Sequence, residues 1–368
     1  MYSEQELDDA VASGVITAAA AEALRAHIEG QRSMVIADEE QFRLITGFND
    51  IFVSIAAAIL LFAVGWIGQS IGSSLGLVID GDGPSLLAPL AVAATAWGLA
   101  LFFTAKRRMA LPSILLLLAF VIGSFVTAGF GLVSIIGTNA FDRTPELGGL
   151  VAAVAGIVGA GAAWVHWRSF RVPITIAAGT AAAAAMVVGL LVAALGERLE
   201  NAHDLILGIT LMLGIGTFLF AMWWDSSDRA RLTRRSDVAF WLHLLAAPMI
   251  IHPVFTLLGL NDGNATIGEG FVVILLYVII GLTALAIDRR ALLVSALAYV
   301  LYALTELFKQ FGAVELNVAL TALVIGSALL MLSAFWHQAR RAVVVRLPEV
   351  LRDKLPMIDR PATMPQPA

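Results

Sequence analysis

DSSDRARLTRRSD (residues 225–237) is followed directly by VAFWLHLLAAPMIIHPVFTLLGL (residues 238–260). The first stretch is polar and carries four arginines, whereas the second is apolar and long enough to cross a lipid bilayer. A basic connector next to an apolar span is typical of the cytoplasmic side of a membrane. This junction therefore predicts both a membrane-spanning helix and its direction.

The same alternation of apolar blocks and short polar connectors extends over most of the chain. Of its 368 residues, 59% are hydrophobic and 14% are charged, and the mean hydropathy is +0.87, which excludes an ordinary soluble protein. The apolar residues come in blocks of about 20, the number that spans ~30 Å of hydrocarbon as a helix. We therefore expect an all-α fold, a polytopic transmembrane helix bundle.

Ten apolar blocks are long enough to be spans of that bundle. They cover Ile51 to Ile71, Leu86 to Ala105, Leu111 to Ile136, Gly149 to Trp167, Pro173 to Leu195, Leu205 to Trp224, Val238 to Leu260, Phe271 to Ile287, Ala291 to Phe311, and Ala313 to Trp336.

The distribution of Lys and Arg predicts how these ten spans are oriented. If both termini are cytoplasmic, twenty of the 23 basic residues lie on the cytoplasmic side, and only Arg143, Arg198 and Lys309 lie outside. Such an asymmetry follows the positive-inside rule. We expect a multi-pass protein of the cell inner (plasma) membrane with its N- and C-termini in the cytoplasm.

The chain divides into four parts by composition. Residues 1–48 predict a cytoplasmic helical hairpin, 49–336 the ten-helix transmembrane domain, 337–355 a basic amphipathic juxtamembrane segment, and 356–368 a disordered tail rich in proline. In the hairpin, Ser3 and Glu6 have capping-box spacing, and Thr17 can cap a second helix. The hairpin has too few apolar residues for a core of its own, so we expect it to dock on the membrane part or on a copy of itself.

Several classes of chemistry are excluded or disfavoured. The absence of cysteine excludes disulfides and thiolate metal sites. No catalytic or phosphate-binding motif occurs, so we expect no enzyme activity, cofactor or metal, with a motif-poor intramembrane enzyme as the remaining enzymatic alternative. Nothing in the charge pattern indicates nucleic-acid binding. The expected partner is the lipid bilayer, and the sequence is compatible with a small-molecule or lipid ligand and with a homo-oligomer.

The seventh apolar block contains unusual residues for a membrane helix. His243 and His252 are nine positions apart, and nine steps of about 100° leave them on opposite faces, which argues against joint ligation of one metal. Pro248 and Pro253 each remove one intrahelical hydrogen bond and are candidates for a helix break. Two interpretations follow: a packed hinge with hydrogen-bonded histidines, or a binding or proton-handling site near His252.

A second group of polar residues is expected toward the outer side of the bundle. Glu306 is the acid that lies deepest within the predicted spans. Tyr302, Asn317 and His252 are expected in the same outer half of the membrane as Glu306. These four side chains could line an outward-facing polar cavity for a substrate or a proton. Alternatively, Glu306 forms a local ion pair with Lys309, three residues further on the same helix face.

The fourth apolar block carries small residues at a helical spacing, namely Gly149, Ala152, Gly156, Ala160 and Ala163. Small residues about every fourth position let helices approach closely, which is the packing rule in lipid. We interpret this block as tightly packed scaffold and not as the lining of a pore.

Two short segments of the chain are similar to each other. KRRMALPSIL (106–115) and DRRALLVSAL (288–297) share two arginines, two leucines and a serine at matching offsets. Duplicated helix pairs would explain this similarity. A shared demand for a basic turn followed by leucines would explain it equally well.

Three stretches carry a resemblance to known families: LDDAVASGVITAAAAEALRAHI (7–28), FNDIFVSIAAAILLFAVGWIG (48–68) and DRRALLVSALAYVLYAL (288–304). In their arrangement they resemble bacterial predicted multi-pass membrane protein families of unknown function that have a short helical N-terminal cytoplasmic unit. The resemblance covers most of the chain in layout and implies no activity or functional residue.

Two functions from different classes fit these observations. The first is a transporter or permease-like protein for a small or lipophilic solute, favoured by ten spans and by the prolines of the seventh. The second is a structural or regulatory membrane protein that acts through its N-terminal hairpin and basic tail, without a transported substrate.

Overall fold

The computed structural model describes residues 11–23, 48–144, 146–196, 198, 202–231, 233–260, 267–290, 292–294, 296–297, 300–301, 304–305 and 317–358. These residues are predominantly α-helical, and their only β-type pairing is an isolated bridge between Val78 and Ser85. The expected all-α class is confirmed.

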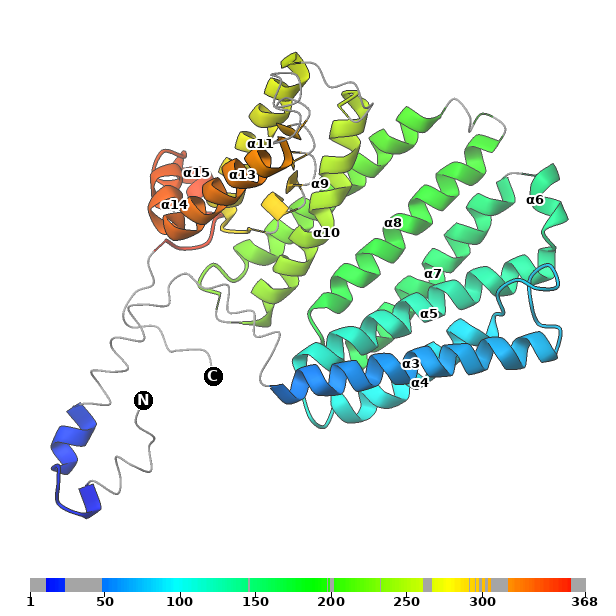
Figure 1. Cartoon of the computed structure of the whole chain (residues 1–368), viewed down its shortest axis with the longest axis horizontal. Coiled ribbons are helices and arrows are strands. Elements are labelled where there is room, and N and C mark those ends of the chain that lie inside the picture. The colour runs from blue at the N-terminus through cyan, green and yellow to red at the C-terminus, as the bar shows by residue number, and fades with distance from the viewer. Residues whose placement is uncertain are drawn as a thin grey trace. The chain divides into compact units, whose positions relative to one another are not determined.

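From α3 to α11 the helices follow one another with short connectors between them (Figure 1). They are α3 (Phe48–Ser74), α4 (Leu87–Phe103), α5 (Ala110–Ile136), α6 (Asn139–Arg143), α7 (Glu146–Phe170), α8 (Ile174–Leu195), α9 (His203–Ser226), α10 (Arg234–Leu257), α11 (Ile267–Ile287), α13 (Asn317–Ala334), α14 (Trp336–Val344) and α15 (Glu349–Arg352).

Seven of the described helices are long and apolar enough to cross a membrane: α3, α5, α7, α8, α9, α10 and α11. Helix α4 is apolar but has 17 residues, and α13 forms a further candidate span together with α14, from which it is bent by 74°. The predicted ninth block, Ala291 to Phe311, lies largely outside the described residues. The chain is thus a multi-pass membrane protein, while the count of ten spans stays a prediction.

The surface of α3 shows the inverted polarity of a helix in lipid. Its large apolar side chains Ile59, Phe62 and Trp66 are 65%, 72% and 70% exposed, whereas Asp50 and Ser54 face inward and are buried. A soluble helix would place these side chains the other way round, because burial of apolar area is what stabilises it in water. The exposed apolar face of α3 therefore faces hydrocarbon.

Small residues bring α7 and α8 into backbone contact. A Cβ atom added at Gly156 would lie 2.7 Å from the backbone nitrogen of Met186, and one added at Gly189 would lie 2.6 Å from that of Ala153. The two helices run side by side in Figure 1. The predicted tight packing of this small-residue block is confirmed.

The chain forms two compact units, Arg43–Pro356 and a second one made of Met1–Phe42 with Met357–Ala368. In the second unit, the predicted cap at Thr17 is confirmed, since its Oγ1 accepts a hydrogen bond from the backbone nitrogen of Ala20 at 3.2 Å. Ser3 and Glu6 lie outside the described residues, and so does most of the predicted tail. All helices from α3 onward belong to the first unit, which also holds the candidate site.

The two similar segments, 106–115 and 288–297, differ in structure where their sequences agree. The left-handed residue of the first turn is Arg108 (φ 52°), whereas in the second it is Asp288 (φ 58°), two alignment positions earlier. Arg107 is exposed, but its counterpart Arg289 is buried. This difference favours a shared demand for a basic turn over a duplicated unit.

Candidate functional site

Buried charged side chains gather where the connector between α9 and α10 meets the turn that follows α11. Asp225 lies in the last turn of α9, His243 on the inner face of α10, and Arg289 in the turn after α11. Asp225 and His243 are fully buried, and Arg289 is 3% exposed. We call these three residues the Asp225 cluster.

The carboxylate of Asp225 is the centre of this cluster. Nη2 of Arg289 donates to Oδ1 at 2.5 Å, Nε of Arg289 donates to Oδ2 at 3.3 Å, and Nε2 of His243 lies 3.2 Å from Oδ2. Two nearly parallel bonds from one guanidinium to one carboxylate are a strong, directional form of ion pair. The cluster thus joins α9, α10 and the turn after α11 through a single acid.

The two partners of Asp225 differ in how completely their polar atoms are satisfied. Arg289 also donates to the backbone carbonyl of Ser236 at 3.0 Å, and its guanidinium lies 6.0 Å from the ring centre of Phe240. With Asp225 ionised, Nε2 of His243 is the protonated ring nitrogen, which leaves Nδ1 as an acceptor. This Nδ1 is buried and has no hydrogen-bond partner within the part of the chain that the structure describes.

Local bonds in the α9–α10 connector position the ends of both helices. Oγ1 of Thr233 accepts from the backbone nitrogen of Arg235 and so caps α10. Oδ2 of Asp228 accepts from the backbone nitrogen and the Oγ1 of Thr233, at 2.9 and 2.7 Å. Arg231 takes a left-handed conformation (φ 54°) within this connector. The polar side chains of this connector therefore stabilise a compact turn, from which the Arg231 side chain reaches Asp288.

A second buried group, the Asp288 cluster, consists of Arg231, Asp288, Trp336 and Arg340. Nη1 of Arg231 donates to Oδ2 of Asp288 at 2.7 Å, and the indole Nε1 of Trp336 donates to Oδ1 at 2.7 Å. Nε of Arg340 lies 3.7 Å from the same Oδ1. Burial and the neighbouring cation Arg289 lower the pKa of the Arg231 guanidinium, and the carboxylates of Asp288 and Asp225 act against that shift. Asp288 thus compensates buried positive charge.

Arginines of this region also bind the end of the first unit. Nε and Nη2 of Arg229 donate to the backbone carbonyls of Leu355 and Arg352, at 2.9 and 3.1 Å. Nη2 of Arg340 donates to the carbonyl of Pro356 at 2.8 Å. The segment after α14 is therefore held against the same connector that carries Arg231.

The sequence-predicted histidines separate in the structure as their spacing indicated. His243 is buried in the Asp225 cluster, whereas His252 is exposed, and its carbonyl accepts a hydrogen bond from Oγ1 of Thr256. The predicted polar cavity is not tested: Tyr302 and Glu306 lie outside the described residues, and so does the side chain of Asn317. That grouping stays a prediction.

The two helix-break candidates of the seventh block, Pro248 and Pro253, lie inside one continuous helix, and whether they bend it stays a prediction. Helix α10 continues through Pro248 and Pro253 from Arg234 to Leu257. Proline fixes φ near the helical value, so its ring is compatible with helix geometry once neighbouring contacts compensate for the lost hydrogen bond. Here Pro253 is buried, and Gly214 of α9 packs directly against Met249 between the two prolines.

Four residues of the two clusters were interpreted from sequence only as parts of connectors: Asp225, Arg231, Asp288 and Arg289. An acid at the very end of an apolar span, followed or preceded by arginines, is the sequence signal that would have indicated them. The positive-inside rule does not detect that signal, because it counts every arginine in a connector alike, whether the side chain is solvated or buried.

A second buried histidine, His166 on α7, lies apart from the two clusters. Its Nδ1 is 3.3 Å from Oγ1 of Thr175, and its ring centre is 4.6 Å from that of Phe170. Within the described residues, no group of three His, Asp or Glu side chains has the arrangement of a metal site. His166 is thus a packed polar side chain in an aromatic environment.

Comparisons of this chain with protein-family models, with curated proteins and with solved structures found no match.

Proposed function

We propose that this protein is a permease-like transporter of the cell inner (plasma) membrane, with both termini and the basic connectors in the cytoplasm, that moves a small or lipophilic solute. In this proposal the Asp225 cluster closes the solute path at the cytoplasmic ends of α9 and α10. The observation that carries the proposal is the burial of Asp225, His243 and Arg289 between two helices and a turn.

Burial of this cluster supports a functional role because apolar side chains pack helices at a lower free-energy cost. Replacing a buried ion pair by apolar residues of similar volume is often neutral or stabilising in proteins. Ionisable groups inside a membrane domain mark solute or proton paths more often than plain packing. The cluster is therefore better explained as a gate than as scaffold.

His243 provides a way to open such a gate. Protonation of its buried Nδ1 places a second cation beside Arg289, and the two then compete for the single carboxylate of Asp225. Weakening the pair between Arg289 and Asp225 releases the turn after α11 from α9. A proton arriving at His243 would thus loosen the contact between three elements.

The contact of α9 with α10 also supports a pivot in α10 between Pro248 and Pro253, beyond His243 of the Asp225 cluster. A Cβ atom added at Gly214 would lie 2.8 Å from the backbone carbon of Met249, in the stretch between Pro248 and Pro253. Each proline removes one hydrogen bond from that stretch, so bending is easier there than elsewhere in α10. The two helices are thus in close contact at the segment that can bend.

The competing function is a structural or regulatory membrane protein without a transported substrate. In that case the two clusters only fasten the connectors to each other, and no water-filled path reaches the buried face of α10. Accessibility of that face to a water-soluble reagent distinguishes the two functions.

The experiment uses single cysteines, since the chain has none of its own. Ala246→Cys lies one helical turn beyond His243 and is fully buried, and Ala96→Cys on α4 is an equally buried control far from the cluster. A charged, membrane-impermeant methanethiosulfonate is applied to vesicles of either orientation that contain the full-length protein. Ser227→Cys, which is exposed in the α9–α10 connector, is the reference for complete labelling of an accessible cysteine.

If the protein is a permease, Ala246→Cys reacts from both sides of the membrane, about tenfold or more faster than Ala96→Cys. The reason is that the solute path of a permease opens alternately to the two sides of the membrane. An added Asp225→Asn increases the rate from the side on which Ser227→Cys reacts. Equal, negligible reaction of Ala246→Cys and Ala96→Cys overturns the proposal and supports the structural alternative.

A further inference from the structure

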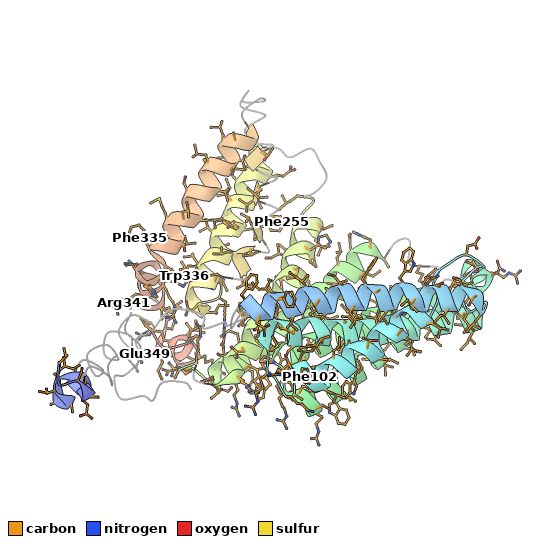
Figure 2. All side chains as sticks on the ribbon, turned by 60° about the horizontal axis from the view of Figure 1, so that its bottom comes forward. Phe102, Phe255, Phe335, Trp336, Arg341 and Glu349 are labelled. Atoms are coloured by element: carbon orange, nitrogen blue, oxygen red, sulfur yellow. The ribbon has the colours of Figure 1, made fainter. Side chains whose placement is uncertain are left out.

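The chain changes direction sharply at the junction of α13 and α14. The chain bends by 74° between the two helices, at Phe335. Phe335 is 56% exposed, whereas the next residue, Trp336, is 2% exposed. Figure 2 labels Phe335, Trp336 and Arg341 at this corner. If α13 crosses the membrane close to its normal, α14 lies nearly in the plane of the membrane surface.

One face of α14 is fixed to the protein. Trp336, Arg340 and Val344 follow each other at four-residue intervals and are all buried. Trp336 donates to Asp288, and Arg340 donates to the carbonyl of Pro356. The inner stripe of α14 is therefore occupied by partners within the first unit, and its opposite face is turned outward.

The outward face of α14 and the following segment combines cationic and apolar side chains. Val345, Val350 and Leu351 are 59%, 73% and 50% exposed. The basic side chains Arg341, Arg346 and Lys354 are exposed as well. Apart from the buried Arg340, residues 337–356 contain four basic and two acidic residues, and one of the acids, Glu349, lies 3.5 Å from Arg352 within the segment. The outer face thus carries net positive charge around an apolar centre.

This combination fits one occupant, the headgroup layer of an anionic membrane. Arginine and lysine attract anionic headgroups, while neighbouring valine and leucine side chains enter the boundary between headgroups and acyl chains. An acidic protein surface would match the charges but would leave no reason for the position of this face at the end of a span. If α13 crosses the membrane, the bend at Phe335 places this face at the end of a span, next to the headgroup layer.

We propose that the outer face of α14 and of the segment that follows it, formed by Arg341, Val345, Arg346, Val350, Leu351 and Lys354, is a docking surface for anionic lipid headgroups of the bilayer that surrounds the protein. This surface is independent of whether the protein transports a solute.

The test places an environment-sensitive nitrobenzoxadiazole label on Val350→Cys in the full-length chain. The labelled protein is reconstituted into nanodiscs of phosphatidylcholine alone, or of phosphatidylcholine and phosphatidylglycerol in equal parts. Emission wavelength and quenching by headgroup-proximal spin-labelled lipid report contact with the membrane. The same label on Ser227→Cys, exposed in the α9–α10 connector, controls for general effects of lipid composition.

We expect the label at residue 350 to shift to shorter wavelength and to be quenched severalfold more in discs with phosphatidylglycerol. This difference is lost near 1 M salt, where the Debye length falls to about 3 Å. The triple variant Arg341→Gln/Arg346→Gln/Lys354→Gln also loses it. The matched variant Lys106→Gln/Arg107→Gln/Arg108→Gln, which removes three exposed charges from the α4–α5 connector, keeps it.

Equal emission and quenching in both kinds of nanodisc overturn the proposal, as does an equal loss in the matched variant. A lipid difference that persists at high salt and in the triple variant also overturns it, because the contact is then not electrostatic. The salt experiment needs no substitution at the charged positions, so it does not depend on the folding of the triple variant.

Discussion

Asp288 and Arg289 are neighbours in the chain, yet their side chains enter two different buried clusters. Asp288 accepts from Arg231 and Trp336, whereas Arg289 binds Asp225. The left-handed conformation of Asp288 (φ 58°) ends α11 and directs the two side chains apart. One turn therefore connects the position of α14, through Trp336, with the pairing of α9 and α10 at Asp225.

We predict that Asp225→Asn lowers the free energy of unfolding by about 3–5 kcal/mol, because Arg289 and His243 stay buried without their charged acceptor. Thermal unfolding of the purified protein in detergent, followed by tryptophan fluorescence, measures the loss. Asp204→Asn is the control: it makes the same change on α9 at an 87% exposed side chain and leaves stability nearly unchanged. Equal effects of the two substitutions would contradict the buried pair.

The double variant Asp225→Asn/Arg289→Gln is expected to be less destabilised than the sum of its two single variants, because no charge is then buried alone. A double-mutant cycle of thermal unfolding gives the coupling, for which residues in direct contact show ~0.5–3 kcal/mol. Strict additivity would show that the two side chains do not interact.

Trp336→Phe is predicted to destabilise the protein by about 1.5–3 kcal/mol, the range for a hydrogen bond to a charged group. The substitution removes the indole N–H from Asp288 and keeps an aromatic ring beneath Arg290, whose guanidinium lies 4.8 Å from the Trp336 ring centre. Trp223→Phe, at a 62% exposed position on α9, is the matched control. If both variants unfold at the same temperature, the bond to Asp288 has no stabilising effect.

Gly156→Ala is predicted to destabilise the contact between α7 and α8, whereas Gly161→Ala on the same helix does not. A Cβ atom at residue 156 meets backbone atoms of Met186 and Ala182 at 2.7 and 2.8 Å, so the helices must separate. At residue 161 no atom lies within 4 Å, and the higher helix propensity of alanine favours that variant by roughly 0.5–1 kcal/mol. The unfolding temperatures of the two variants should change in opposite directions; a stabilised Gly156→Ala would exclude close packing.

The predicted orientation is tested with Ser227→Cys and Asp82→Cys in intact cells. Both positions are exposed, the first in the α9–α10 connector and the second between α3 and α4. Because basic connectors stay in the cytoplasm, an impermeant maleimide should label Asp82→Cys in intact cells and Ser227→Cys only after permeabilisation. The reversed pattern would overturn the orientation.

The fold class and the packing of α7 against α8 could be predicted because both depend on local composition. An apolar block of about 20 residues has few alternatives to a spanning helix, and glycine or alanine at every fourth position has few uses other than close contact. The separation of His243 from His252 followed from helix geometry alone. The buried ion pairs could not be predicted in the same way, since an arginine in a polar connector has the same local sequence whether it points to water or to Asp225.

A helical multi-pass membrane protein follows from the amino-acid pattern, because the bilayer forces each long apolar block to satisfy its own backbone hydrogen bonds. Which charged side chains are removed from solvent depends instead on the three-dimensional packing. Asp225 meets Arg289, and Asp288 meets Trp336, across separations of 64 and 48 residues. Such pairs depend on how the ends of several helices converge, and no local pattern of residues encodes that convergence.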